Sequence, residues 1–357
     1  MTDALRSDDP ALVRAIIDDR LSTWAGEVLG GPDTDPETRE TATRALETCA
    51  TIRASTEHAA DPLTSALRAA GVESTITTSD QRHTILVEVT PSDASAAIVA
   101  LESCGYARAR EWVGAAARSF LRFGGGTILT RTEGRTSVID LRWHRTTAKR
   151  SRLRSFADRV IVPTPADWAI VDLPERLWWA YGALRPFRLL AERLGLASDE
   201  HGDLEPFLVT PDALLDPLFQ VAELGESDVF ADIGCGDGRI VCAAARRRGC
   251  RALGVDQSAD AVGTARRRVD DARLSDRVRI VHADAQDVDL SETTAALFFV
   301  PMAVAVRLVP SVLRQMSSGG RVILHEQSDL DPTLPKPTHS TAIIAADAVT
   351  VAHRWDR

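Results

Sequence analysis

The chain has 357 residues, more than one typical domain of about 100–200 residues, so we expect two domains. It is 44% hydrophobic and 26% charged, which is typical of a globular protein, and no apolar stretch is long enough to span a bilayer. A net charge of −9 argues against general binding to nucleic acid or to an anionic membrane. The acidic start argues against a signal or transit peptide, so we expect a cytoplasmic protein. The cysteines lack the spacings of zinc sites and disulfide frameworks, so we expect reduced thiols and no metal.

Helices and strands are mixed in the N-terminal half of the chain. Leu12, Ile16 and Leu21 recur at helical spacing, which predicts a helix within residues 1–30. The further predicted elements are a loop at 31–40, a helix at 46–52, a strand at 84–89, a helix at 91–104, strands at 127–131 and 137–141, and a helical stretch at 163–195. The polar segment 196–206 contains Gly and Pro and indicates a domain boundary.

From residue 207 onward, short apolar strands alternate with helical segments. Strands are predicted at 229–233, 252–256, 278–282, 295–300 and 322–325 and around Ile343 and Val351, and helices at 239–248, 258–274 and 303–316. This alternation predicts a doubly wound, mostly parallel α/β sheet of the Rossmann-like type. Ligands of such sheets bind beyond the carboxyl ends of the strands.

A glycine-rich loop follows the first of these strands. It reads Asp-Ile-Gly-Cys-Gly-Asp-Gly-Arg over residues 232–239, with glycines at 234, 236 and 238. Glycines let a ligand approach the backbone closely, and the helix that follows offers free N–H groups. The spacing is G-x-G-x-G, whereas dinucleotide sites read G-x-G-x-x-G. The second strand ends in Asp256, where an acid can accept hydrogen bonds from ribose hydroxyls, and Asp284 follows the third strand.

The polar and aromatic residues at the other strand and helix ends have several interpretations. Thr210 followed by Pro211 is a favourable helix start, with Thr as the cap. Phe299 near the fourth strand's end is either buried core or a wall of the reaction site. His325 and Glu326 at the end of the fifth strand are candidate bases for an acceptor, or simply polar strand ends.

These motifs resemble the class I methyltransferases that use S-adenosylmethionine (SAM). Residues 205–326 are similar to one branch of that class, the protein-lysine methyltransferases of the type that modifies the c-subunit of ATP synthase. This chain departs from the family pattern in two ways. We find no hydrophobic N-terminal segment of the kind that relatives acting on the membrane subunit carry. The Phe298–Met302 stretch stands where other amino-group methyltransferases have an Asn/Asp-Pro-Pro-aromatic motif.

The resemblance implies roles for residues of this chain. It places Asp232 against the ammonium group of SAM, Asp284 against the adenine amino group and the Thr210 hydroxyl against the SAM carboxylate. The complete set of expected cofactor-binding residues is Thr210, Asp232, Gly234, Cys235, Gly236, Gly238, Asp256, Gln257, Asp284, Ala285 and Phe299.

The N-terminal half resembles a nucleotidyltransferase-like family. In that alignment Thr84 and Leu86 replace two metal-binding Asp residues, and Asp140 matches the third carboxylate. Because Mg²⁺ sites need paired carboxylates, the resemblance implies a fold that has lost nucleotidyl transfer. An unrelated α+β domain is the alternative. The arginine-rich stretch 142–154 is either a solvated surface or a site for an acidic substrate. Trp168, Trp178 and Trp179 are expected in a core or an interface.

We therefore expect a nucleotidyltransferase-like α+β domain at 1–160, a helical linker at 161–204 and a seven-stranded class I methyltransferase domain at 205–357. The expected reaction moves a methyl group from SAM to a nitrogen or oxygen of a polypeptide or a peptide-like natural product. The N-terminal domain would serve acceptor recognition or dimerisation, with a homodimer as one outcome and no nucleic acid or membrane partner. The alternatives are a small-molecule methyltransferase of specialised metabolism and a SAM-binding regulatory or scaffold protein.

Overall fold

The computed structural model describes residues 4–32, 34–79, 81–108, 114–123, 125–131, 137–143, 163, 173–193, 210–300, 302–326 and 330–357. The chain divides into two compact units. The C-terminal unit contains Met1–Ile52, Asp80–Arg82 and Val209–Arg357, and the middle unit contains Arg53–Ser79 and His83–Leu208. Much of the expected linker at 161–204, together with Trp168 and most of the arginine-rich stretch, lies outside the described residues.

The described residues of the C-terminal unit form an eight-stranded sheet in the order β1-β12-β13-β11-β10-β7-β8-β9. The strands are β1 (Leu5–Ser7), β7 (Val229–Ile233), β8 (Arg251–Asp256), β9 (Val278–His282), β10 (Ala295–Phe298), β11 (Arg321–Glu326), β12 (His339–Ile344) and β13 (Val349–Asp356). Strands β7 to β11 are parallel, and β13, β12 and β1 follow in antiparallel pairs. The expected Rossmann-like sheet is therefore present, with β1 as an unexpected eighth strand.

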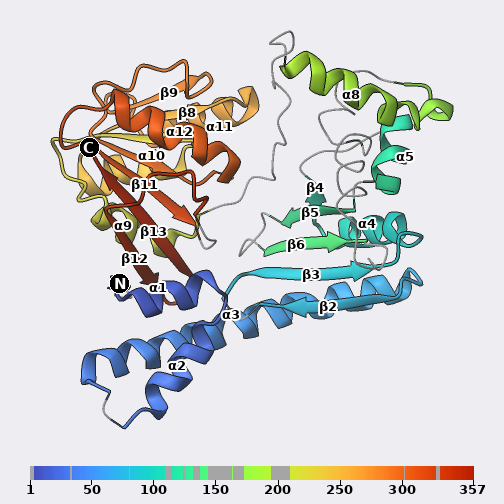
Figure 1. The fold of residues 1–357 in the computed structure, drawn as a ribbon, viewed down its shortest axis with the longest axis horizontal. Helices are drawn as coiled ribbons and strands as arrows, with labels where there is room; N and C mark the ends of the chain where they lie inside the picture. The colour runs from blue at the N-terminus through green and yellow to red at the C-terminus, as the bar shows by residue number, and fades with distance from the viewer. Residues whose placement is uncertain are drawn as a thin grey trace. The chain divides into compact units, whose positions relative to one another are not determined.

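Helices pack on both faces of this sheet because buried strand residues point alternately to the two sides (Figure 1). One face is covered by α9 (Asp212–Val221), α10 (Arg239–Arg248) and α11 (Ala259–Asp271). The other face packs against α12 (Met302–Gln315) over its central strands. The described helices lack the combination of length and apolar composition that crossing a membrane requires.

The N-terminal residues complete the second face of the same sheet. Helices α1 (Pro10–Ile17), α2 (Leu21–Gly30) and the first part of α3 (Pro36–Ala69) bury an apolar cluster against β12 and β13. Leu12 and Leu21 are fully buried there, beside Ile344 and Val351. The expected boundary of an N-terminal domain at 1–160 therefore differs from the structure, because residues 1–52 supply the cover that β12 and β13 need.

The middle unit is a separate α+β structure. Its described strands form a mixed sheet in the order β2-β3-β6-β5-β4, where β3 and β6 are parallel. The strands are β2 (Ser74–Thr78), β3 (Thr84–Val89), β4 (Ala107–Arg108), β5 (Gly126–Arg131) and β6 (Ser137–Arg142), and the helices include α4 (Ala94–Ser103), α5 (Gly114–Phe123) and α8 (Ala180–Arg193). Trp178 packs against the core, whereas Trp179 is 59% exposed.

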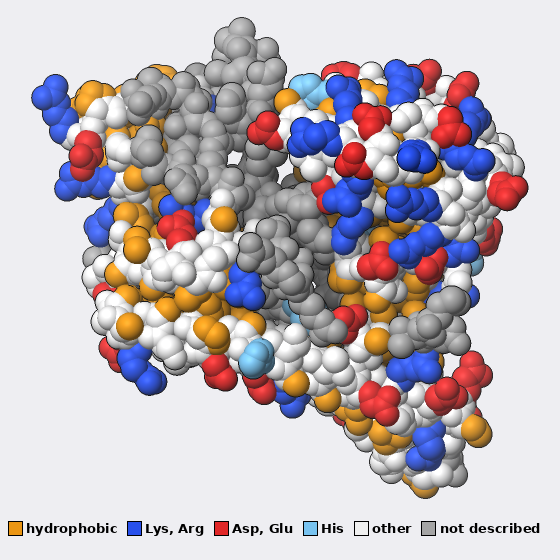
Figure 2. Space-filling model, turned by 180° about the vertical axis from the view of Figure 1, so that it is seen from behind, with side chains coloured by type: hydrophobic (Ala, Val, Ile, Leu, Met, Phe, Trp, Pro, Cys, Tyr) orange, Lys and Arg blue, Asp and Glu red, His pale blue; other side chains and the backbone are white. Residues whose placement is uncertain are grey.

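On the face of the C-terminal unit that Figure 2 shows, basic and acidic side chains are interspersed. The arginines that end α10 pair with acids of α9, as in Arg247–Asp212 at 2.7 Å and Arg248–Asp216 at 3.2 Å. Exposed pairs of this kind contribute little stability individually. These pairs neutralise the basic end of α10.

Candidate active site

The glycine-rich loop joins β7 to α10 at the carboxyl edge of the parallel strands. Gly234, Gly236 and Gly238 all have positive φ angles, of 80°, 52° and 74°. Residues with a Cβ rarely adopt this conformation, so the sequence needs glycine at each position. A Cβ on Gly238 would also lie 2.9 Å from the Cβ of Ala265 in α11. The loop therefore brings its backbone close to neighbouring elements, with the start of α10 directly behind it.

Asp232 is the most unusual carboxylate beside this loop. It lies in β7, is 2% exposed, and its Oδ2 atom has no hydrogen-bond partner among the described residues. Burial, followed by the nearby charges of Asp256 and Asp237, raises the pKa of Asp232 to about 7. A buried carboxylate without a partner is costly, which suggests a site that a cationic ligand completes.

Asp256 is held in a different way at the end of β8. Its Oδ2 accepts a hydrogen bond from the backbone N–H of Gly236 at 2.8 Å, and its Oδ1 accepts one from the N–H of Ser258 at 2.8 Å. Asp256 therefore connects the glycine loop to the start of α11. Each carboxylate oxygen still has lone pairs for ligand hydroxyls.

The third expected acid, Asp284, contacts a residue that directly follows β8. Asp284 follows β9, and its Oδ2 accepts a hydrogen bond from Nε2 of Gln257 at 3.0 Å. Its Oδ1 accepts from the backbone N–H of Gln286 at 2.9 Å, so the turn after β9 fixes the carboxylate. Ala285 is buried among the apolar residues under α12. The structure therefore brings Gln257, Asp284 and Ala285 to the same edge as the glycine loop.

Thr210 contacts the ends of two other elements of the same unit. Its side chain does not cap α9 as expected: Pro211 takes the cap position, without a side-chain hydrogen bond. The Oγ1 atom of Thr210 instead lies 3.0 Å from Nε2 of His325. The guanidinium group of Arg239 donates to the carbonyl oxygen of Thr210, which ties this segment to the start of α10. The Thr210 hydroxyl therefore contacts His325 rather than the start of α9.

His325 and Phe299 form a stacked pair above the ends of β11 and β10. Their ring centroids are 4.3 Å apart with an interplanar angle of 19°. Burial lowers the pKa of His325 to about 3, and the residue is 3% exposed. This burial argues against His325 as the base that deprotonates an acceptor, because both ring nitrogens face threonine hydroxyls. The backbone of Glu326 ends β11, but its side chain lies outside the described residues.

Two residues of this site were not selected from the sequence alone. Arg239 belongs to the glycine motif, and a basic residue directly after the loop was the signal that could have identified it. Thr350 lies in β13, and its Oγ1 is 3.5 Å from Nδ1 of His325. No local sequence pattern identifies Thr350, because its contact with His325 depends on how the strands are arranged in the sheet.

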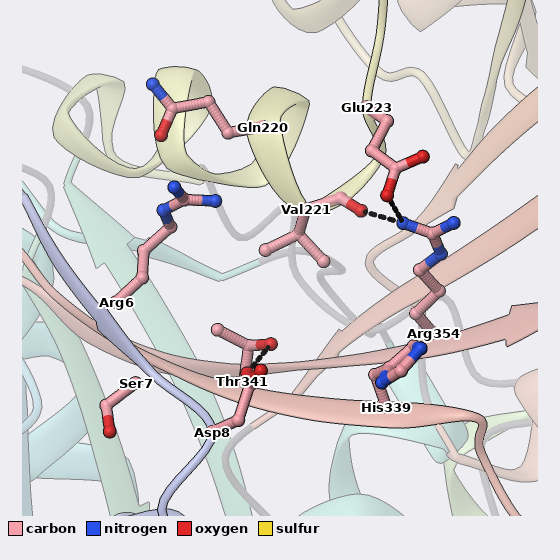
Figure 3. Close-up of a pocket in the computed structure, with 9 residues that line it drawn as sticks. All are labelled: Arg6, Ser7, Asp8, Gln220, Val221, Glu223, His339, Thr341 and Arg354. Atoms are coloured by element: carbon pink, nitrogen blue, oxygen red, sulfur yellow. Dashed lines mark hydrogen bonds and ion pairs between the residues drawn. The ribbon is translucent and has the colours of Figure 1, made fainter.

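A polar pocket of about 340 Å³ lies elsewhere in the C-terminal unit (Figure 3). It is lined by Arg6, Ser7, Asp8, Gln220, Val221, Glu223, His339, Thr341 and Arg354. Its residues come from β1 and the position directly after it, from β12 and β13, and from the end of α9 with the turn that follows it, and none of them belongs to the glycine loop. Glu223 pairs with Arg354 at 2.8 Å, and Asp8 accepts a hydrogen bond from Thr341. The pocket is therefore separate from the glycine loop, and its acids already have partners.

The middle unit places the residues of the nucleotidyltransferase-like alignment side by side. Leu86 of β3 faces Asp140 of the parallel strand β6, and Thr84 lies on the same face as Leu86. The Asp140 carboxylate accepts hydrogen bonds from Nε of Arg142 at 2.9 Å and from Nη2 at 2.5 Å. Among the described residues, the Asp140 carboxylate is therefore engaged with Arg142.

A Rossmann-like sheet with this glycine loop and acids at the ends of its first three parallel strands defines a class I SAM-dependent methyltransferase. Residues 232–328 match the model of the ANTKMT methyltransferase domain. The chain is also 30% identical over 122 residues to a protein-lysine N-methyltransferase of Saccharolobus islandicus (strain REY15A), a match that covers 34% of this chain and 76% of that protein. The chain therefore belongs to the same methyltransferase family as that protein, and SAM is its cofactor.

Two solved structures are also similar to this chain. An RNA methyltransferase from Salinibacter ruber in complex with S-adenosylhomocysteine is 30% identical, covers 42% of this chain and 93% of its own, and has a TM-score of 0.37. A SAM-dependent methyltransferase from Thiobacillus denitrificans, also with S-adenosylhomocysteine, is 24% identical. This match covers 33% of this chain and 48% of that chain, with a TM-score of 0.30. These TM-scores are low, so the assignment to the family rests on the sequence match.

Proposed function

We propose that this methyltransferase acts on an amino nitrogen of a polypeptide, with a lysine side chain as the first candidate. The supporting observation is the sequence match to a protein-lysine N-methyltransferase over most of that protein's length. SAM supplies an activated methyl group for transfer to a nucleophile. The chain's own residues then have to bind the cofactor, orient it and keep the acceptor amine neutral.

Cofactor binding is assigned to the carboxyl edge of the sheet. Asp232 binds the ammonium group, because its buried oxygen has no partner among the described residues. Thr210 binds the carboxylate, Asp256 the ribose hydroxyls and Asp284 the adenine amino group. Gln257 holds Asp284 in place at 3.0 Å. The loop glycines and Cys235 let the cofactor lie against the backbone, and Ala285 lies beside the adenine.

Phe299 is proposed to wall the place where the methyl group is transferred. Its ring is fixed by stacking on His325, and burial leaves the imidazole uncharged. An apolar wall disfavours a charged ammonium group and lowers the pKa of an amine beside it. A lysine acceptor must lose its proton before it attacks, so this wall favours the reactive form. Alignment of the two reactants then supplies much of the reduction in the barrier.

The middle unit is proposed to recognise the acceptor, as a nucleotidyltransferase-like fold without its metal site. Its described part exposes Val99 at 64%, Trp179 at 59% and Phe187 at 72%. Large exposed apolar side chains are typical of surfaces that bind other proteins. A variant that replaces Trp179 and Phe187 with Ser should bind SAM normally but methylate its acceptor more slowly.

Transfer of radiolabelled methyl groups tests the proposal. The full-length protein is incubated with methyl-labelled SAM and an extract of proteins, and the labelled products are hydrolysed to amino acids. Methyllysine in the hydrolysate is the expected result, and Asp232→Asn serves as the matched inactive control. Label only in small molecules would favour specialised metabolism, and SAM binding without transfer to any acceptor would favour a regulatory protein.

A further inference from the structure

Three buried side chains connect β13 to the cofactor edge of the sheet through hydrogen bonds. Thr350 lies 3.5 Å from Nδ1 of His325, and Nε2 of His325 lies 3.0 Å from Oγ1 of Thr210. Thr350 and Thr210 are each 2% exposed and His325 is 3% exposed. The chain of contacts therefore ends at the hydroxyl that is proposed to bind the SAM carboxylate, and this inference rests on that assignment.

The ring of His325 is uncharged, since desolvation lowers its pKa to about 3. One face of the ring stacks on Phe299, which supplies no charge that would favour a proton. A neutral imidazole has one N–H donor and one acceptor nitrogen. The direction of the whole chain of hydrogen bonds is therefore fixed by which nitrogen carries the proton.

The position of Thr210 leaves little freedom for its side chain. Its carbonyl oxygen accepts from Arg239, and Pro211 restricts the backbone that follows. The side chain is β-branched and therefore has few rotamers. With the oxygen atom fixed, the remaining variable is where the hydroxyl proton points. If Nε2 of His325 were the acceptor, this proton would point toward the ring and the lone pairs of Thr210 toward the ligand.

We propose that His325 is a positioning residue that carries its proton on Nε2 and donates it to Thr210. Oγ1 of Thr210 then accepts from the ring, and its own proton is available to the SAM carboxylate. Thr350 donates to Nδ1 at the far end of the chain. All three donors thus point in one direction, from β13 toward the cofactor. The opposite tautomer would present lone pairs to the carboxylate and repel it.

Comparison of SAM with decarboxylated SAM tests this proposal, because decarboxylated SAM keeps the ammonium group and the adenosine but lacks the carboxylate. The variant His325→Phe keeps an aromatic ring against Phe299 and removes both nitrogens. Calorimetry should show SAM binding weakened roughly 10- to 100-fold, the effect of one lost hydrogen bond to a charged group. Binding of decarboxylated SAM should change less than about twofold.

Two further variants separate this proposal from a structural effect. Thr210→Val should reproduce the selective loss, and the double variant should lose no more selectivity than either single change, because both remove the same donor. His325→Gln, whose amide nitrogen can approach the place of Nε2, should recover part of the SAM affinity. Equal weakening toward both ligands in His325→Phe would mean that His325 only supports the fold, and would overturn the proposal.

The assignment of the cofactor site is tested separately by Asp232→Asn. This variant should weaken SAM and decarboxylated SAM together, since both carry the ammonium group. Unchanged binding of both would overturn the proposed site, whatever His325 does. The tautomer itself is measured without any variant by ¹⁵N NMR of the histidine rings in the empty protein. We expect His325 to remain protonated on Nε2 alone from pH 5 to 8, and protonation on Nδ1 would refute the proposed direction.

Discussion

Replacement of Asp232 by Asn should stabilise the empty protein while it removes SAM binding. Asp232 is buried in β7 and one of its oxygens has no partner among the described residues. The pKa of its carboxyl is raised from 3.8 to about 7, mainly by burial. A raised pKa means that the folded state holds a proton that the unfolded state has lost. Stability therefore falls as the pH rises from about 4 through about 7.

The size of this effect on stability follows from the rise of the pKa of Asp232 from 3.8 to about 7, since each pKa unit corresponds to about 1.4 kcal/mol. Above pH 7 the folded protein carries a buried charge whose cost is about 4 kcal/mol, and at pH 5 the cost is about 2 kcal/mol. Asn has nearly the same shape and no charge. Its gain in the free energy of unfolding over the natural protein should therefore be larger at pH 8 than at pH 5, by about 2–3 kcal/mol.

Urea denaturation of the unliganded protein at pH 5 and pH 8 measures this difference, and calorimetry measures SAM binding. Asp237→Asn is the matched control, since Asp237 lies in the same loop but is paired with Arg268. The control should gain far less at pH 8 than Asp232→Asn, because it removes only a lesser cause of the raised pKa of Asp232 and also breaks the pair with Arg268. If Asp232→Asn were no more stable than the natural protein at pH 8, or bound SAM with an unchanged Kd, the reasoning about this buried charge would be refuted.

Asp256→Ala should lower the free energy of unfolding by about 1–3 kcal/mol and also weaken SAM binding, because two backbone N–H groups lose their acceptor; unchanged thermal unfolding would show that this connection carries no stability. Leu12→Ala should cost about 2–5 kcal/mol in thermal unfolding of the C-terminal unit, and a change below about 0.5 kcal/mol would contradict the packing of α1 on β12. Gly238→Ala should destabilise the loop by about 1–3 kcal/mol, since its φ is 74°; circular dichroism melting would detect it. The full chain should show no magnesium-dependent ATP binding in calorimetry, and such binding would overturn the alignment of Asp140.

The parallel strands could be predicted from the sequence because they are short and mostly apolar, and most of them have a glycine or an acid at or near an end. The predicted strand at 229–233 coincides with β7, and the predicted strand at 278–282 coincides with β9. Strands buried on both faces leave this continuous apolar signal. The glycine loop was equally visible, since positive φ angles restrict the choice of residue. Local physics therefore predicted the parallel strands and the loop between β7 and α10 well.

The partner of the N-terminal helices could not be predicted in the same way. The spacing of Leu12, Ile16 and Leu21 shows that one helix face is buried, but not which surface it covers. Strand β1 has three residues and no apolar run, and it pairs with β12 across more than 300 positions of sequence. The contact between Thr210 and His325 also joins residues 115 positions apart. Such pairings depend on topology, and the sequence alone left their partners open.

Asp232 and Asp256 lie in different environments at neighbouring strands, and this contrast supports the two different roles proposed for them. Asp256 receives two backbone N–H groups, so its charge is already stabilised and it can accept weaker bonds from neutral hydroxyls. Asp232 receives none at Oδ2, and burial makes its charge costly. The first environment suits a sugar, and the second suits a cation that restores the missing interaction. If Asp232 binds the ammonium group as we propose, cofactor binding recovers the free energy that this buried charge costs the empty protein.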